Sequence, residues 1–273
     1  MTWVLAKPFM QDYSLIIADI CVTFEDPKTK SKTYADCLLK IHDISRDNGL
    51  MVGFSGRVEN AFNIIDDMRI LASDMALKSH NRKFDVLDFI KEWQKYTVNN
   101  GKHLYDDYDN SVHMFIAGNH TEVDSVGNRY APSGVYQVKS PDYRPMATHP
   151  FHWSHIGSGS DMVVCKAIVD QLSNDFIFRI AAIDTSAEKL VDFLAPRISA
   201  VLEQGLTEKG VSSSLVIGIS GIGDTALATT YPGDDSIPNK PPKLATTYEE
   251  LLTMFDDASA KANFFASQRL KSD

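Results

Sequence analysis

The residue with the most chemical potential in this sequence is Thr2. The initiator methionine is normally removed when the second residue is small, and its removal would leave this threonine at the N-terminus. Such a residue carries a hydroxyl nucleophile together with its own base, because the α-amine has an ordinary pKa of about 7.7–8.0. Many proteins begin with Met-Thr, so Thr2 alone does not distinguish a nucleophile from an ordinary first residue.

Three other segments contain residue types that bind metals or nucleotides. Segment 149–155 reads His-Pro-Phe-His-Trp-Ser-His, but histidines three apart on a strand alternate between its faces and do not converge on one ion. The aspartates of 105–111 lack the glycine and terminal glutamate of an EF-hand loop. The glycines of 218–223 follow a strand without a dinucleotide-binding βαβ unit. We therefore expect no metal and no organic cofactor.

The composition narrows the class of protein. The chain has 273 residues, of which 44% are hydrophobic and 23% charged, as is typical of globular proteins with a sizeable core. Its net charge of −9 argues against nucleic acid and anionic membrane as partners. No apolar run reaches the roughly 18 residues of a membrane span, and the first residues lack a signal-peptide pattern. The three cysteines are too widely spaced for a disulfide framework, so we expect a soluble cytoplasmic protein.

The elements that must position Thr2 begin with strands. Apolar and β-branched residues predict strands over Thr2–Lys7, Ser14–Phe24, Cys37–Ile44 and Leu50–Phe54, with a polar loop over 25–33. The last two strands flank Arg46-Asp-Asn-Gly49, and Asn-Gly is the strongest short signal for a hairpin. The opening of the chain therefore predicts an antiparallel meander.

Helices and strands then alternate in groups. Helical spacing of apolar residues runs from Glu59 to Met75 and from Lys83 to Asn100. Further strands are expected over 113–118, 134–139, a stretch ending at Ile156, 213–220 and 225–230. Between them, helices are expected over 160–172 and from a capping box at Thr185 to about Glu208, with a kink at Pro196.

The order of the elements predicts an α+β fold. Helices segregated from antiparallel strands are typical of this class, and a four-layer αββα sandwich would place a helix pair on each sheet. Residues 1–230 form the expected domain, and 231–273 add a Pro-rich linker and an amphipathic helix over Tyr248–Leu270. That helix must cover its apolar face on its own subunit or on a neighbouring one, and we favour the neighbour.

Four short motifs occur in an order that resembles one family. They are Ser14-Leu-Ile-Ile-Ala-Asp19, Leu39-Lys-Ile-His-Asp-Ile44, Leu50-Met-Val-Gly-Phe-Ser-Gly56 before a helix, and Ile156-Gly-Ser-Gly-Ser160. Over roughly residues 2–221 the chain resembles the proteasome β-subunit family, and most of all its simple bacterial relatives, the peptidase of the HslUV protease and the Anbu-type peptidases. These are threonine-type N-terminal nucleophile (Ntn) hydrolases. The resemblance implies an αββα sandwich, to which this chain adds its C-terminal helical extension.

The resemblance gives five residues a role. Thr2 matches the nucleophile, Asp19 the acidic partner, and Lys40 the lysine whose charge lowers the pKa of the amine. Gly53 matches the glycine whose N–H forms the oxyanion hole, and Ser158 matches the serine near the amine.

Each of these matches has a purely structural alternative. Asp19 could end a strand in a turn, Lys40 could lie on an edge strand, and Gly53 could mark a bulge. Segment 157–159 could simply lead to a helix N-cap. The chain also departs from the family at 204–208, where members usually place an Asp and a Ser and this sequence reads Gln-Gly-Leu-Thr-Glu.

The function that the resemblance implies is a self-assembling threonine-type peptidase that hydrolyses a polypeptide or peptide substrate without a metal or organic cofactor. It also implies a homo-oligomeric ring and leaves room for an ATP-dependent unfoldase as a partner. Two alternatives stay open: a catalytically silent Ntn-fold scaffold for assembly or binding, and an Ntn amidohydrolase that acts on a small amide.

Overall fold

The computed structural model describes residues 3–9, 13–25, 30, 32–78, 85–107, 109–120, 122–123, 129–130, 133–149, 152–159, 163–174, 186–202, 212, 214–221, 223–230 and 243–256. Helices are combined with antiparallel sheets, so the predicted α+β class is confirmed. Thr2 lies outside the described residues, as do 203–210 and the linker 231–242.

The first sheet joins strands from both ends of the chain. Its order is β12-β1-β2-β13-β14, and each neighbouring pair is antiparallel. The strands are β1 Val4–Phe9, β2 Tyr13–Asp19, β12 Ser154–Ile156, β13 Leu215–Gly221 and β14 Asp224–Thr230. All residues of β13 are buried, as are all but the first of β2, because both strands are central and covered on two faces.

The second sheet comes from the middle of the chain and has the order β11-β10-β7-β6-β5. Its strands are β5 Ile41–Ser45, β6 Leu50–Gly56, β7 Val112–Asn119, β10 Ser133–Lys139 and β11 Met146–Ala147. The predicted Asn-Gly turn is confirmed between β5 and β6. There Gly49 has a φ of 63°, a value that residues with a side chain rarely adopt.

Four shorter strands pair outside these sheets. They are β3 Cys21–Glu25 with β4 Lys32–Asp36, and β8 Glu122–Val123 with β9 Arg129–Tyr130. The β3–β4 ribbon begins two residues after β2 ends, so the predicted strand 14–24 divides into two strands. The expected loop 25–33 contains the start of β4.

The helices lie close to their predicted positions. They are α1 Val58–Lys78, α2 Val86–Asn100, α3 Val163–Asn174 and α4 Ala187–Leu202, with Pro196 inside α4. The Asp85 carboxylate caps α2 by accepting the N–H groups of Leu87 and Asp88. Within the described residues, no helix has both the length and the apolar character needed to cross a membrane.

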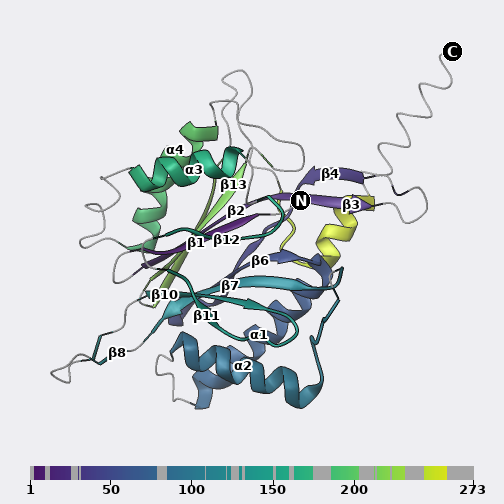
Figure 1. Cartoon of the computed structure of the whole chain (residues 1–273), viewed down its shortest axis with the longest axis vertical. Helices are drawn as coiled ribbons and strands as arrows, with labels where there is room; N and C mark the ends of the chain where they lie inside the picture. The colour runs from purple at the N-terminus through teal and green to yellow at the C-terminus, as the bar shows by residue number, and fades with distance from the viewer. Residues whose placement is uncertain are drawn as a thin grey trace.

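Three apolar clusters join these elements. The cluster between the two sheets includes Val4, Ile16, Met51, Phe115 and Val216. A second joins α1 and α2 to the outer face of the second sheet, and a third joins α3 and α4 to the outer face of the first. Figure 1 shows α3 and α4 above the first sheet, and α1 and α2 below the second.

The described part of the C-terminal tail packs on its own chain. A helix runs over 248–256, and Ala245 and Leu251 are buried in the same cluster as α1 and α2. This part of the tail therefore docks on its own subunit, which is the alternative that we did not favour from the sequence. Residues 257–273 lie outside the described part of the chain.

Candidate functional site

A fully buried ion pair lies where β2 ends and β5 begins. The Lys40 Nζ atom is 2.7 Å from Asp19 Oδ1, and neither side chain is exposed to solvent. The same ammonium donates to the carbonyl oxygen of Cys21 at 2.6 Å. Burying a charge is costly unless it is paired and hydrogen-bonded, and here both conditions are met. The sequence-predicted partners Asp19 and Lys40 are thus brought together.

The Asp19 carboxylate also holds the start of the described chain. Its Oδ1 atom accepts the N–H of Trp3 at 3.0 Å, and its Oδ2 atom accepts the N–H of Cys21 at 3.1 Å. Burial raises the pKa of the Asp19 carboxyl from its ordinary value, while the Lys40 charge and these hydrogen bonds oppose that shift. The Trp3 nitrogen is the atom that bonds covalently to residue 2, so the ion pair borders the peptide group that follows Thr2.

The segment that carries Lys40 is fixed by backbone hydrogen bonds. The N–H groups of Cys37 and Leu38 both donate to the carbonyl of Ile20, the residue between β2 and β3. The carbonyl of Lys40 accepts the N–H of Phe54 at 3.1 Å. These bonds explain why the predicted strand over 37–44 begins only at residue 41: the preceding residues bond to the β2–β3 junction instead.

The turn that carries Ser158 packs against Trp3. Strand β12 pairs with β1 through Ile156 and Val4, which brings the following turn toward Trp3. A Cβ atom on Gly159 would lie 2.7 Å from Trp3 Cδ1, so only glycine fits beside the buried indole. The structure therefore brings the turn of Ser158 to the residue whose nitrogen Asp19 binds. Ser158 itself is exposed.

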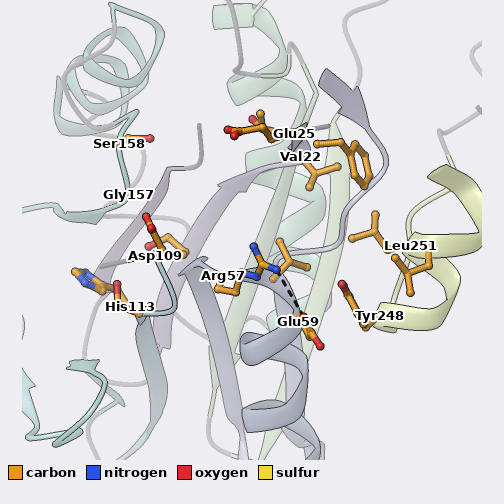
Figure 2. Close-up of a pocket in the computed structure, with 17 residues that line it drawn as sticks. Val22, Glu25, Arg57, Glu59, Asp109, His113, Gly157, Ser158, Tyr248 and Leu251 are labelled. Carbon is orange, nitrogen blue, oxygen red and sulfur yellow. Dashed lines mark ion pairs between the residues drawn. The ribbon is translucent and has the colours of Figure 1, made fainter. Parts of the chain in front are cut away.

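A cavity of about 700 Å³ opens beside this turn. Ser158 lines it together with Ser55, Gly56 and Arg57, which come from the end of β6 and the start of α1. Figure 2 shows Ser158 and Gly157 on one side of the cavity and Arg57 near its centre. The Arg57 guanidinium forms an ion pair with Glu59 at 3.8 Å.

The structure does not bring Gly53 to this cavity. Gly53 lies in the middle of β6, paired with Ile41 of β5 and Phe115 of β7. A Cβ at this position would lie 2.7 Å from Ile16 Cγ2, so the missing side chain lets the two sheets approach each other. Successive N–H groups along a strand point to opposite neighbours, and that of Phe54 points to β5. The N–H of Gly53 therefore points to β7, into the sheet.

Gly56 lines the cavity but was not among the candidates from the sequence. It ends β6 directly before α1, has a φ of 108°, and lines the cavity with Ser55. Its N–H lies on the same side of β6 as that of Phe54, at a point where β5 has not yet begun. The available signal was its place as the last glycine before a predicted helix, where a strand end exposes backbone donors.

The remaining candidates do not join this site. His149 and His152 have ring centroids 4.6 Å apart, but both are exposed. No group of three or more His, Cys, Asp or Glu side chains that could hold a metal occurs in the part of the chain that is described. Residues 204–208 lie outside that part.

Neither the family models nor the curated proteins compared with this sequence give a match.

Proposed function

We propose that this protein is a threonine-type Ntn peptidase, with Thr2 as the nucleophile once the residue before it has been removed. The observation that carries the proposal is the buried Asp19–Lys40 pair, whose carboxylate binds the Trp3 nitrogen at 3.0 Å. A lysine ammonium held beside the N-terminal residue disfavours a second positive charge on its α-amine, so the amine stays neutral and basic.

The chemistry follows from this arrangement. The Thr2 Oγ atom attacks the scissile carbonyl while the α-amine accepts the hydroxyl proton. The developing oxyanion is stabilised by a backbone donor, and we assign that role to the N–H of Gly56 because it lines the cavity, whereas Gly53 does not. The amine then gives its proton to the leaving nitrogen, with the Ser158 hydroxyl as relay, and water hydrolyses the acyl-enzyme.

The fold supports the same proposal. Two five-stranded sheets face each other across an apolar cluster, and a helix pair covers the outer face of each. This arrangement is the one expected of an αββα sandwich of the Ntn type. The proposal includes a peptide or polypeptide substrate and a homo-oligomeric ring that encloses the sites.

The first test combines mass and activity. The intact mass of the purified protein should correspond to a chain that begins at Thr2, and the protein should cleave fluorogenic peptide amides. Thr2→Ala should reduce cleavage by at least about 1000-fold, because it removes the attacking oxygen, whereas Thr2→Ser keeps a hydroxyl and should retain measurable cleavage. Size-exclusion chromatography with light scattering should give all three proteins the same mass.

Two outcomes would contradict the proposal. Full activity in Thr2→Ala would eliminate the mechanism. A chain that retains Met1 and cleaves no amide, while still assembling, would instead favour the silent scaffold.

A further inference from the structure

The C-terminal segment bonds to the residues that lead into Lys40. The Ala245 N–H donates to the carbonyl of Cys37 at 2.7 Å, and the Leu39 N–H donates to the carbonyl of Ala245 at 3.1 Å. Leu38 and Ala245 form a parallel bridge, and both are buried. The tail is thus built into the structure immediately beside the candidate catalytic lysine.

The helix that follows is fixed at its start and along its length. The Glu250 carboxylate accepts the N–H and the hydroxyl of Thr246, and the Thr247 hydroxyl accepts the N–H of Glu250. Farther along, the ring of Phe255 stacks on that of Phe24 with centroids 4.2 Å apart. These contacts hold the helix in one orientation against β3.

This fixed helix forms one wall of the candidate site's cavity. Tyr248, Leu251 and Leu252 line it, opposite the side occupied by Ser158. Figure 2 shows Leu251 and Tyr248 at one end, with Val22 nearby and Ser158 at the far end. Leu251 is almost fully buried, but Leu252 has 43% of its surface exposed, so a large apolar side chain is accessible at this wall.

The charged groups of the cavity compensate one another near this wall. Arg57 and Glu59 form an ion pair, and Glu59 also accepts a hydrogen bond from the Tyr248 hydroxyl. Glu25 pairs with Lys30 and Lys32 at 3.5 and 3.9 Å. Arg57, Glu59 and Glu25 therefore each have an oppositely charged partner, and the rest of the surface at the tail end of the cavity is largely apolar.

We propose that the segment 243–256 is the specificity wall of the peptidase site, and that it selects substrates with an uncharged apolar side chain beside the scissile bond. This inference rests on the proposed function. The reacting bond lies at the Ser158 and Gly56 end, and the apolar side chain lies against Leu252, Val22 and Val58. Burial of that side chain supplies the selectivity, because an apolar side chain gains by leaving water there, whereas a lysine side chain would lose hydration against these apolar groups.

The test uses Leu252 variants and a matched control. Wild type should cleave a Gly-Gly-Leu aminomethylcoumarin amide with a kcat/KM at least about tenfold above that for the Gly-Gly-Lys amide. Leu252→Glu should lower this ratio by at least about tenfold, because the new carboxylate repels the apolar side chain and attracts the lysine. Leu77→Glu changes a leucine that is 72% exposed on α1, outside the cavity lining, and should leave the ratio unchanged. Far-UV circular dichroism and Tm should show that both variants fold.

A binding measurement separates this inference from the peptidase proposal. Fluorescence anisotropy is measured with dye-labelled Gly-Gly-Leu and Gly-Gly-Lys carrying a free C-terminal carboxylate, which resemble cleavage products. If wild type binds the leucine peptide preferentially and Leu252→Glu abolishes that preference, the wall is supported even if no amide is cleaved. Only the peptidase proposal would then fail. Cleavage with equal leucine-to-lysine ratios in wild type and Leu252→Glu would overturn the wall and leave the peptidase standing. Absence of both cleavage and binding would overturn both.

Discussion

The buried ammonium of Lys40 neutralises the Asp19 carboxylate, and in the proposed mechanism it also lowers the pKa of the Thr2 amine. Its ammonium has no contact with water, and it is held by the Asp19 carboxylate at 2.7 Å and the Cys21 carbonyl at 2.6 Å. The positive charge therefore lies beside the carboxylate that accepts the Trp3 N–H, and in the proposed mechanism it would keep the amine of Thr2 neutral. The family motifs suggested that Lys40 pairs with Asp19, but its burial could not be deduced from the sequence, which left an edge-strand position open.

The first residue-scale prediction concerns Lys40→Ala. Removing the charge should raise the pKa of the Thr2 amine, so the rising limb of the pH–rate profile should move to higher pH. At neutral pH kcat/KM should fall by about 100-fold, the usual contribution of a positioned base. The profile of kcat/KM over about pH 6–9 with a fluorogenic peptide measures both effects.

Lys40→Arg provides the matched comparison. It keeps the charge, but the broad planar guanidinium must fit where a compact ammonium already makes two short contacts in a fully buried position. Arginine should therefore fail almost as badly as alanine. Wild-type rates in Lys40→Ala across this pH range would remove Lys40 from the mechanism.

At the scale of elements, glycines determine which backbone segments can meet. Gly53 and Gly159 both leave room for a neighbour: Gly53 for the side chains of the opposite sheet, and Gly159 for the Trp3 indole. Only the second contact belongs to the candidate site. A glycine in a sequence motif thus indicates that another segment packs closely on the backbone, but it does not indicate which segment that is.

Gly159→Ala should move the turn of Ser158 away from Trp3. The added Cβ would lie 2.7 Å from Trp3 Cδ1 and 3.0 Å from Trp3 Cβ, so the turn and the indole must move apart. We expect a loss of about 1–3 kcal/mol in the free energy of unfolding, measured by urea denaturation, together with reduced peptide cleavage.

Gly134→Ala is the control for this change. Its Cβ would meet the Tyr136 ring at 3.2 Å, in a strand of the other sheet and outside the lining of the cavity. A smaller loss of stability with unchanged cleavage is expected. Equal effects of the two substitutions on cleavage would mean that the Gly159 contact does not matter to the site.

Much of the element pattern could be predicted because it depends on local signals. Helical spacing located α1 and α2, and the Asn-Gly pair at 48–49 located the β5–β6 turn. The site could be predicted only in part. Asp19 and Lys40 were found through their motifs, but the choice between Gly53 and Gly56 depends on which N–H leaves the sheet. The direction of each N–H is set by the register of β6 with its neighbouring strands, and the spacing of apolar residues in the sequence does not give that register.

The tail shows the same limit over a longer range. Its amphipathic pattern predicted a helix that needs cover, and part of that helix is described. The apolar face of this part of the tail packs against Phe24 and against the cluster that contains Leu38, more than two hundred residues earlier in the chain. Contacts between such distant residues depend on how the whole chain folds, so the choice between own subunit and neighbour had no local signal.

At the scale of the whole molecule, His42 makes global stability depend on pH. Its ring is almost completely buried between Phe54 and Phe62, and Nε2 is 2.8 Å from the carbonyl oxygen of Leu39. Burial, assisted by the nearby Arg69 charge, lowers the pKa of His42 to about 4. The folded protein therefore keeps this ring neutral under conditions in which the unfolded chain protonates it.

The sign of the effect follows from proton linkage. Below its ordinary pKa of 6.5 the unfolded state binds a proton that the folded state does not, so acidification favours unfolding until about pH 4. Between about pH 7.5 and pH 5 the free energy of unfolding should fall by about 2 kcal/mol from this group alone. Urea titrations of wild type and His42→Gln measure the difference, which the variant should lack. His155→Gln, at an exposed position, should behave like wild type.

The order of the first sheet also determines how a newly made chain matures. Strands β1 and β2 leave the ribosome before the other described strands, and they can pair as soon as both have emerged. The inner edge of β2 must wait for β13, which begins only at residue 215, and the segment before Lys40 must wait for Ala245. Each growing chain on a polysome thus carries an open apolar strand edge until β13 has emerged, and during that time neighbouring chains are close enough to pair with it. Under the proposed function, a chain that has been synthesised only as far as residue 214 lacks β13 and Ala245, and it should not yet cleave its neighbours.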